Sequence, residues 1–166
     1  MPDISPVTRH RLEIQGFVDD DKEHLAETAP WLRLAFGLCT ILAATGTLMA
    51  SPAILLGLAP IAALGAIFPV HPFDLIYNLG IRRITGTHHL PKRGAPSRFA
   101  CGLGAVWLIA TAALFLEGMS LEGYILGGSL VVVGTLVATT HICIPSMIYR
   151  LIFGWPEQTA TRIKAR

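Results

Sequence analysis

The placement of charge along this chain most constrains what it can fold into. No Asp, Glu, Lys or Arg occurs in residues 34–73, 99–116 or 123–149. A helix needs about 20 apolar residues to cross a bilayer, so the first run can hold two helices joined by a tight turn, and each of the others can hold one. If these helices pair into hairpins that cross a membrane, all 13 Lys and Arg residues fall on the same side of that membrane.

The same asymmetry predicts an orientation. Basic residues flank the runs at the N-terminus, in the middle connection and in the tail, whereas Glu117 and Glu122 lie in the short link between the last two runs. Lys and Arg are retained on the cytoplasmic side of a membrane. We therefore expect a multi-pass protein of the cytoplasmic (inner) membrane, with its N-terminus, middle connection and C-terminus in the cytoplasm.

The boundaries of four spanning helices follow from the same runs. Ser51-Pro52 is the predicted tight turn, because serine caps helices well and proline suits the first turn of a helix but not its interior. We predict an all-α membrane protein with a polar N-terminal segment, a four-span domain and a basic tail. The segment is 1–30, the domain 31–154 with spans at about 31–50, 52–70, 99–116 and 123–145, and the tail 155–166.

Composition favours lipid and argues against nucleic acid. Hydrophobic residues make up 52% of the chain and charged residues 14%, which is outside the usual balance of a soluble domain. The net charge of +2 is small, and no basic run is interleaved with aromatic residues as on a nucleic-acid-binding face. The partners we expect are therefore the lipid bilayer and another membrane protein or complex.

The two predicted hairpins resemble each other in sequence. Residues 33–38 (Arg-Leu-Ala-Phe-Gly-Leu) match residues 98–103 (Arg-Phe-Ala-Cys-Gly-Leu) at an offset of 65. Each half holds two spans, so two tandem hairpins would form a 2+2 parallel repeat about an axis along the membrane normal. Amphipathic segments follow the second and fourth spans, at 72–82 and 146–153. We expect both to lie as short helices in the membrane interface.

Three segments carry a resemblance to a known family. They are 71–78 (His-Pro-Phe-Asp-Leu-Ile-Tyr-Asn), 98–100 (Arg-Phe-Ala) and 143–149 (Cys-Ile-Pro-Ser-Met-Ile-Tyr). Over about Trp31 to Gly154 the chain resembles a family of small bacterial integral membrane proteins known as domain of unknown function 4395. The resemblance implies a four-span bundle in a bacterial membrane, without an established activity.

Cysteine supplies the first candidate site. Many members of the family look to have Cys-x-x-Cys where this chain has Cys143 and Ser146, and some occur beside thioredoxin-like or sulfur-transfer modules. Although the second thiol is missing here, Cys143 begins a helical segment, where backbone dipoles favour a thiolate. Cys101 would lie at a similar depth as a possible second thiol, and Cys39 deeper, towards mid-membrane. The alternative is that all three are small apolar core residues.

Histidine supplies a second candidate site. His71 and His141 end corresponding spans of the two halves and would face one another near the inner interface if the repeat holds. Two histidines on different helices can hold haem, or a metal together with Cys101 and Cys143. Their spacing is not diagnostic, and each ring could simply cap backbone groups or meet headgroups. We therefore expect no metal and no cofactor.

Charged residues at the helix ends have structural or ligand-binding interpretations. Arg33, Arg98 and Arg150 lie where their side chains could extend to lipid phosphates or grip an anionic ligand. Asp74 would pair with Arg82, two helical turns later, or with a neighbouring arginine.

No ionised group within the spans marks a transport path, and the sequence has no paired carboxylate, serine elbow or phosphate-binding glycine loop. The leading hypothesis is therefore a non-enzymatic accessory or scaffold subunit that packs against another membrane complex. The alternative is a membrane thiol-redox or sulfur-handling protein that uses Cys143. A second alternative is a haem or metal carrier through His71 and His141.

Overall fold

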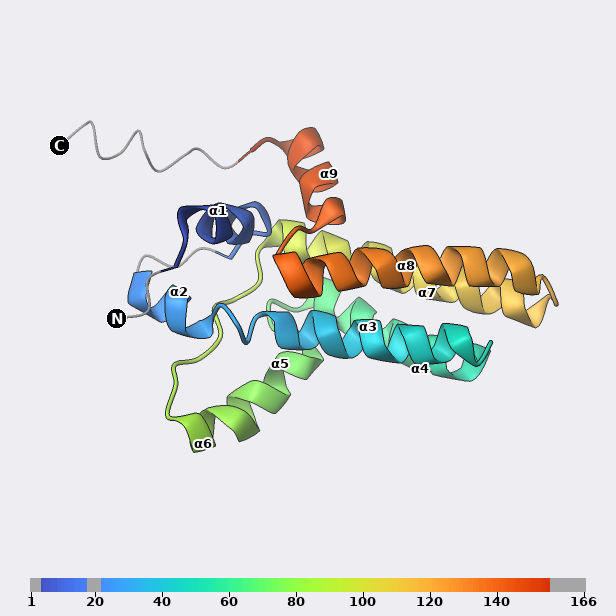
Figure 1. Ribbon diagram of the computed structural model, residues 1–166, viewed down its shortest axis with the longest axis horizontal. Coiled ribbons are helices and arrows are strands. Elements are labelled where there is room, and N and C mark those ends of the chain that lie inside the picture. Colours follow the sequence, from blue (N-terminus) through green and yellow to red (C-terminus); the bar gives the residue numbers. More distant parts are fainter. Residues whose placement is uncertain (1–3, 18–21, 156–166) are drawn as a thin grey trace.

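The long helices of the chain lie side by side as one bundle (Figure 1). A computed structural model describes residues 4–17 and 22–155, and all regular structure in these residues is helical. The bundle consists of α3 (Arg33–Leu48), α4 (Pro52–Ile67), α7 (Ala95–Leu116) and α8 (Ser120–Thr140). The predicted basic tail, apart from Trp155, lies outside the described residues. The all-α class predicted from the sequence is confirmed.

Three helical segments in the described part of the chain are long and apolar enough to cross a membrane. They are His24–Leu48, α7 and α8. The fourth candidate is divided, because α4 is followed after a short break by the helical segment Pro72–Thr85, which is turned from it by 84°. The chain thus has three candidate spans, or up to four if the bent pair counts as one span, which is compatible with a multi-pass membrane protein.

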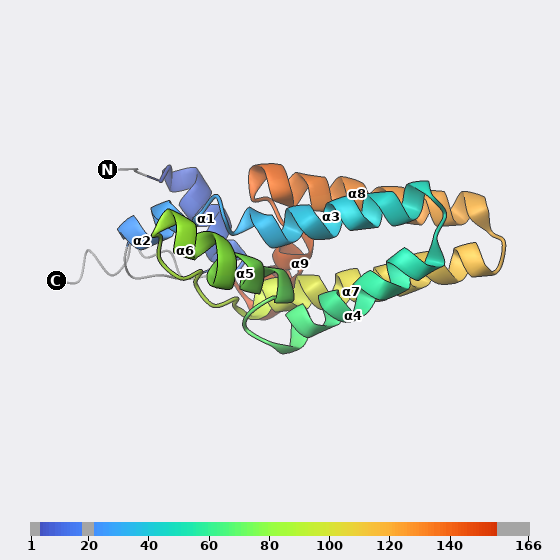
Figure 2. The same cartoon turned by 90° about the horizontal axis from the view of Figure 1, so that it is seen from below.

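The bundle has two layers, with α3 beside α8 in one and α4 beside α7 in the other (Figure 2). A buried apolar cluster lies mainly on α4 and α7 and includes Leu55, Leu58 and Leu108, with Ala43 of α3 as a further member. In the other layer small residues permit close approach, since a Cβ on Gly134 would overlap Thr40 of α3. Small residues at helix contacts are typical of packing in lipid, where apolar burial does not drive helices together.

The ends of the helices differ in part from those predicted. Pro52 begins α4 as expected, but the hydroxyl of the preceding Ser51 makes no capping hydrogen bond. The predicted second span reaches residue 70, whereas α4 ends at Ile67. The predicted fourth span reaches residue 145, whereas α8 ends at Thr140 because His141 adopts a left-handed conformation with φ of 58°. A separate helix, α9 (Ile144–Phe153), then begins.

Short helices follow α4 and α8, at the two places where amphipathic segments were predicted. After α4 come α5 (Pro72–Ile76), the π-helical turn η1 (Tyr77–Ile81) and α6 (Arg82–Thr85). Tyr77 is fully buried, whereas Leu79 and Ile84 are exposed. On α9 the exposed side chains include Leu151 and Phe153, and this helix points away from the bundle axis (Figure 1). Both segments therefore present apolar side chains at the same end of the molecule.

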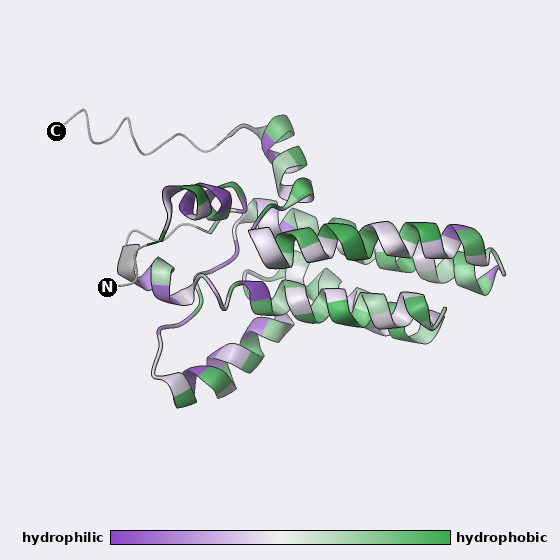
Figure 3. Cartoon of the chain, viewed as in Figure 1, coloured by the Kyte–Doolittle hydropathy of each residue, from purple (hydrophilic) through white to green (hydrophobic). Residues whose placement is uncertain are grey.

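That end, called the basic end here, also carries α1 (Pro6–Ile14) and α2 (Lys22–Thr28), which pack through a second apolar cluster that includes Leu12, Phe17 and Leu25. Figure 3 shows hydrophilic residues gathered at the basic end, with a smaller group at the far tip of α7 and α8. Glu117 and Glu122 lie at that far tip. The charge asymmetry of the sequence is thus an asymmetry between the two ends of the bundle.

A buried ion pair joins the connections at the basic end. The carboxylate of Asp74 accepts two hydrogen bonds from Arg93, from Nε at 2.7 Å and from Nη2 at 2.9 Å. The Arg93 side chain also lies over the ring of Phe36 at 4.9 Å and within 3.3 Å of the Ser97 hydroxyl. The partner of Asp74 is therefore Arg93, one of the neighbouring arginines, and not Arg82, whose Nε donates to the Thr87 carbonyl.

Replacing Arg93 should strongly destabilise the fold. Arg93→Met leaves the Asp74 carboxylate buried without its charged partner, which typically costs about 3–5 kcal/mol. We expect a lower free energy of unfolding, measured by circular dichroism during denaturation in detergent. Arg83→Met, which removes an exposed arginine of α6, is the matched control and should change little. Equal stability of both variants would show that the ion pair does not hold this end together.

Candidate functional site

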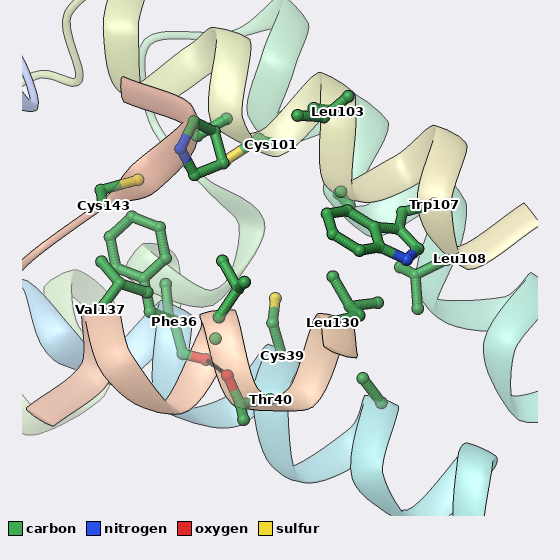
Figure 4. A pocket seen from close by; sticks show the side chains of 18 of the residues that line it. Phe36, Cys39, Thr40, Cys101, Leu103, Trp107, Leu108, Leu130, Val137 and Cys143 are labelled. Atoms are coloured by element: carbon green, nitrogen blue, oxygen red, sulfur yellow. Dashed lines mark hydrogen bonds between the residues drawn. The ribbon is translucent and has the colours of Figure 1, made fainter. Parts of the chain in front are cut away.

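A cavity of about 110 Å³ lies inside the bundle, between its two layers (Figure 4). Side chains of all four long helices line it, and most of them are apolar, including Leu58, Leu108 and Val137. Its polar lining comes largely from the basic end, where His71 and Arg93 reach it. The cavity is therefore an apolar chamber with nitrogen and sulfur groups towards one end.

All three cysteines of the chain line this cavity (Figure 4). Cys39 comes from α3, Cys101 from α7 and Cys143 from the residue that caps α9. All three are free thiols. Three elements far apart in sequence thus bring their thiols to one chamber. Cysteines that act only as small apolar core residues need not gather in this way.

The start of α9 holds Cys143 close to α7. The Ser146 hydroxyl lies 3.2 Å from the Pro96 carbonyl oxygen in the first turn of α7 and 3.1 Å from the Cys143 sulfur. Cys143 occupies the N-cap position, as predicted, but only 4% of it is exposed. Burial raises the pKa of its thiol, and the hydrogen bond from Ser146 opposes this only in part. The thiol is therefore protonated at neutral pH, despite its place at a helix N-terminus.

His71 directs a proton into the cavity. Its Nδ1 accepts a hydrogen bond from the Phe73 backbone N–H at 3.2 Å, so the proton of the neutral ring must be on Nε2. Nε2 lies 3.9 Å from the Cys39 sulfur. The ring packs directly on Gly65 of α4, so closely that a Cβ at this position would overlap it. It therefore cannot move further towards α4. Burial lowers the pKa of His71 to about 4, which keeps the ring neutral.

Arg93 lines the cavity, but its donors are already engaged. Besides the two bonds to Asp74, its Nη1 lies within hydrogen-bonding distance of Ser97. Burial works against its charge, yet the hydrogen bonds and charge of Asp74 outweigh this and hold the pKa of the guanidinium above its ordinary value. Arg93 is thus a fixed positive charge at the edge of the chamber.

The second predicted histidine has a different partner. His141 does not line the cavity, and its Nε2 accepts a hydrogen bond from Arg33 Nε at 2.7 Å. Burial, together with the charge of Arg33, lowers the pKa of His141 to about 4. The two histidines at corresponding helix ends therefore do not share a role. Within the described residues, no group of three or more His, Cys, Asp or Glu side chains is arranged to hold a metal ion.

The arginines predicted to meet headgroups or an anionic ligand donate hydrogen bonds within the protein. Arg98 bonds the Ala66 and Ile67 carbonyls at the end of α4, at 2.9 and 2.6 Å. Arg150 bonds the Glu13 and Ile14 carbonyls at the end of α1. These carbonyls belong to the last turns of α4 and α1, where the helical hydrogen-bond pattern ends, so each arginine caps a helix end. Lipid contact by their remaining donors stays a prediction.

A comparison with family models gives one assignment. Residues 29–153 match the family described as Domain of unknown function (DUF4395). The chain belongs to this family. The matched region contains every cysteine, His71, Arg93 and all four bundle helices, so the cavity lies wholly within the DUF4395 region. No curated protein and no solved structure is similar enough to the chain to count as a match.

Two residues of the site were not identified from the sequence. Cys39 was placed deeper than the other thiols, yet it lines the same chamber because the chamber extends along the bundle from His71 to Leu108. Arg93 was one of several basic residues in the middle connection. A signal was available, since Asp74 is the one acidic residue between Glu27 and Glu117 and a lone carboxylate beside an apolar helix needs a cationic partner.

The two buried imidazoles should make stability depend on pH. The ordinary pKa of histidine is 6.5, and both fall to about 4 in the fold. Between these values the unfolded chain binds more protons than the folded one, so the free energy of unfolding should fall as the pH drops from about 7 to 4. Thermal unfolding at several pH values measures this.

The double variant His71→Asn/His141→Asn is the control. Asparagine is a good N-cap residue at position 71 and tolerates the left-handed conformation at position 141. The free energy of unfolding of the double variant should decline less than that of the unsubstituted chain as the pH drops from about 7 to 4. An equal loss of stability in the double variant and the unsubstituted chain would show that the fold does not keep these two imidazole rings neutral.

Proposed function

We propose that this DUF4395 protein spans the cytoplasmic membrane four times and performs thiol–disulfide redox chemistry in its cysteine-lined cavity. The spans would be α3, α4, α7 and α8, arranged as two tandem hairpins from a duplicated ancestor. The offset repeat of residues 33–38 and 98–103 supports duplication. The packing supports it too, because the contacts of α3 with α4 and α8 correspond to those of α7 with α8 and α4. The basic end would face the cytoplasm.

Topology can be tested by reporters and by labelling. Fusions at both termini should report a cytoplasmic location, because the basic end carries α1 and α9. Single cysteines introduced at Lys92 and Glu117 should be labelled from opposite sides of the membrane by an impermeant reagent. The native cysteines are replaced by serine in that background. A terminus outside the cytoplasm, or both positions labelled from one side, would contradict the arrangement.

The convergence of three thiols on one chamber is the observation that carries the redox proposal. Cys101 and Cys143 are the proposed pair, because the Ser146–Pro96 contact brings the start of α9 against α7. In the reaction each sulfur loses a proton, one S–S bond forms, and two electrons pass to an acceptor. Cys39, beside His71, is the third thiol and could exchange with either partner.

Burial suits this chemistry to the membrane interior. Protonated thiols react slowly with aqueous oxidants, because the thiolate is the reactive form. Cys143 is buried and its pKa is raised. The acceptor would therefore have to enter the chamber or meet it through lipid, and the cavity would be protected from oxidants dissolved in the cytoplasm.

The accessory-subunit hypothesis remains the alternative, and one observation favours it. α9 extends away from the bundle and exposes Leu151, Ile152 and Phe153 (Figure 1), a face that could rest on lipid or on another membrane protein. A partner recovered at fixed stoichiometry in mild detergent, with thiols that never oxidise, would favour this role. For the metal alternative, no group of three or more His, Cys, Asp or Glu side chains is arranged around one point in the described residues. The haem alternative would need His71 and His141 to share a site, whereas His71 lines the cavity and His141 bonds Arg33.

Oxidation should produce a disulfide between Cys101 and Cys143. Membranes treated with a permeant thiol oxidant are quenched with an alkylating reagent, digested and examined by mass spectrometry. The expected product is the linked pair of peptides, lost in Cys143→Ser. Cys39→Ser is the matched control and should leave the link intact. Three cysteines that stay unlinked under oxidation would contradict the redox proposal.

A further inference from the structure

We propose that the cavity binds the ring of a lipophilic quinone, which enters from the bilayer between α7 and α8 and accepts the electrons of the thiols. The inference rests on the proposed redox function and names its oxidant by chemical class. A quinone fits because it is neutral, apolar and flat, carries hydrogen-bond acceptors on its ring, and takes up two electrons with two protons.

The size and lining of the chamber suit no more than a single ring. Its volume of about 110 Å³ is smaller than the apolar cavity of about 150 Å³ that holds benzene, so part of a quinone ring would have to lie in the seam between α7 and α8. The room comes from small side chains, since Ala35, Ala62 and Gly104 all line it. A Cβ placed on Gly104 would meet nothing within 4 Å. Ala100 and Gly104, small residues four apart on α7, both line the chamber and leave space in it.

The lining also explains how a lipophilic molecule could enter. Four residues of α7 and α8 line the cavity and are only partly buried: Leu103, Trp107, Leu130 and Val133. α7 packs less extensively on α8 than on α4. At the basic end, by contrast, the ion pair of Asp74 and Arg93 is buried beneath Phe17 and Phe36. The route through the α7–α8 seam therefore leads to lipid, and the basic end is closed to water.

Two groups are placed to orient a quinone ring. The indole of Trp107 lies at one side of the chamber (Figure 4) and is held by its hydrogen bond to the Leu126 carbonyl at 3.0 Å, so a flat ring can stack against it. His71 also lines the chamber, and among the described residues its Nε2–H has only the weak acceptor of Cys39, at 3.9 Å. A carbonyl oxygen of the ring is a stronger acceptor for that proton.

The reaction balances without a further reagent. Two cysteine thiols lose two protons and two electrons and form one S–S bond. The quinone gains both electrons, and each of its two oxygens gains one proton, which gives the quinol. His71 donates a hydrogen bond to one oxygen and is a positioning residue in this scheme.

Binding can be measured with a short-chain quinone such as a decyl benzoquinone. In a Trp31→Phe/Trp155→Phe background Trp107 is the sole tryptophan, and its fluorescence should be quenched as the ring binds. Gly104→Phe should fill the chamber and weaken binding by about tenfold or more, which corresponds to about 1.4 kcal/mol. Gly57→Phe is the matched control, because Gly57 is exposed on α4 and a Cβ there also meets nothing. Its affinity should be unchanged.

A variant without thiols separates binding from redox chemistry. Cys39→Ser/Cys101→Ser/Cys143→Ser should still bind the quinone but should not reduce it, as followed by quinone absorbance. If this variant binds the quinone but the unsubstituted protein forms no disulfide under any oxidant, the quinone site is retained and the redox function is overturned. Disulfide formation by a thiol oxidant, without quenching by quinone, would retain the function and overturn this inference. Equal quinone affinity in Gly104→Phe and Gly57→Phe would also overturn it.

Discussion

The ion pair of Asp74 and Arg93 fixes the end of the molecule on which the cavity depends. Asp74 belongs to the first turn of α5, where it also accepts the backbone N–H of His71. Arg93 is tied through its own backbone N–H to the Pro69 carbonyl. One buried interaction therefore joins the turn after α4 to the connection before α7. Both charges are satisfied by hydrogen bonds, which is what makes a buried pair tolerable. The imidazole of His71 is oriented as a consequence.

The cavity and the tight packing around it have a common origin in small side chains. Where a glycine faces a side chain of the neighbouring helix, as Gly134 faces Thr40, the helices touch. Where small residues face each other across the two layers, as around Gly104, the space is left open. Unfilled volume costs dispersion contacts, so a chamber that persists in a small bundle is a place where stability is given up, and such places are expected at functional sites.

The helical class followed from the sequence because uncharged runs of bilayer length admit few other structures in lipid. The helix ends followed less well, since nothing local shows that His141 would take a left-handed conformation and end α8 early. The partner of Asp74 depended on tertiary structure, because several arginines lay within reach along the chain and contacts distant in sequence, such as Phe36 over the guanidinium, hold Arg93 in place. Cys39 was missed for the same reason, since depth along a helix does not show which way a side chain faces.

The proposed duplication clarifies which features are structural and which belong to the site. Arg33 and Arg98 occupy equivalent positions, and each donates to the end of the second helix of the other hairpin, Arg33 at His141 and Arg98 at Ala66. Both halves share this role, so we interpret it as structural: each arginine ties its own hairpin to the other one. The histidines differ, because His71 faces the thiols whereas His141 faces Arg33. The contact of His71 with Cys39 is thus not repeated at His141, and this difference between the halves supports the proposal that the chemistry lies beside His71.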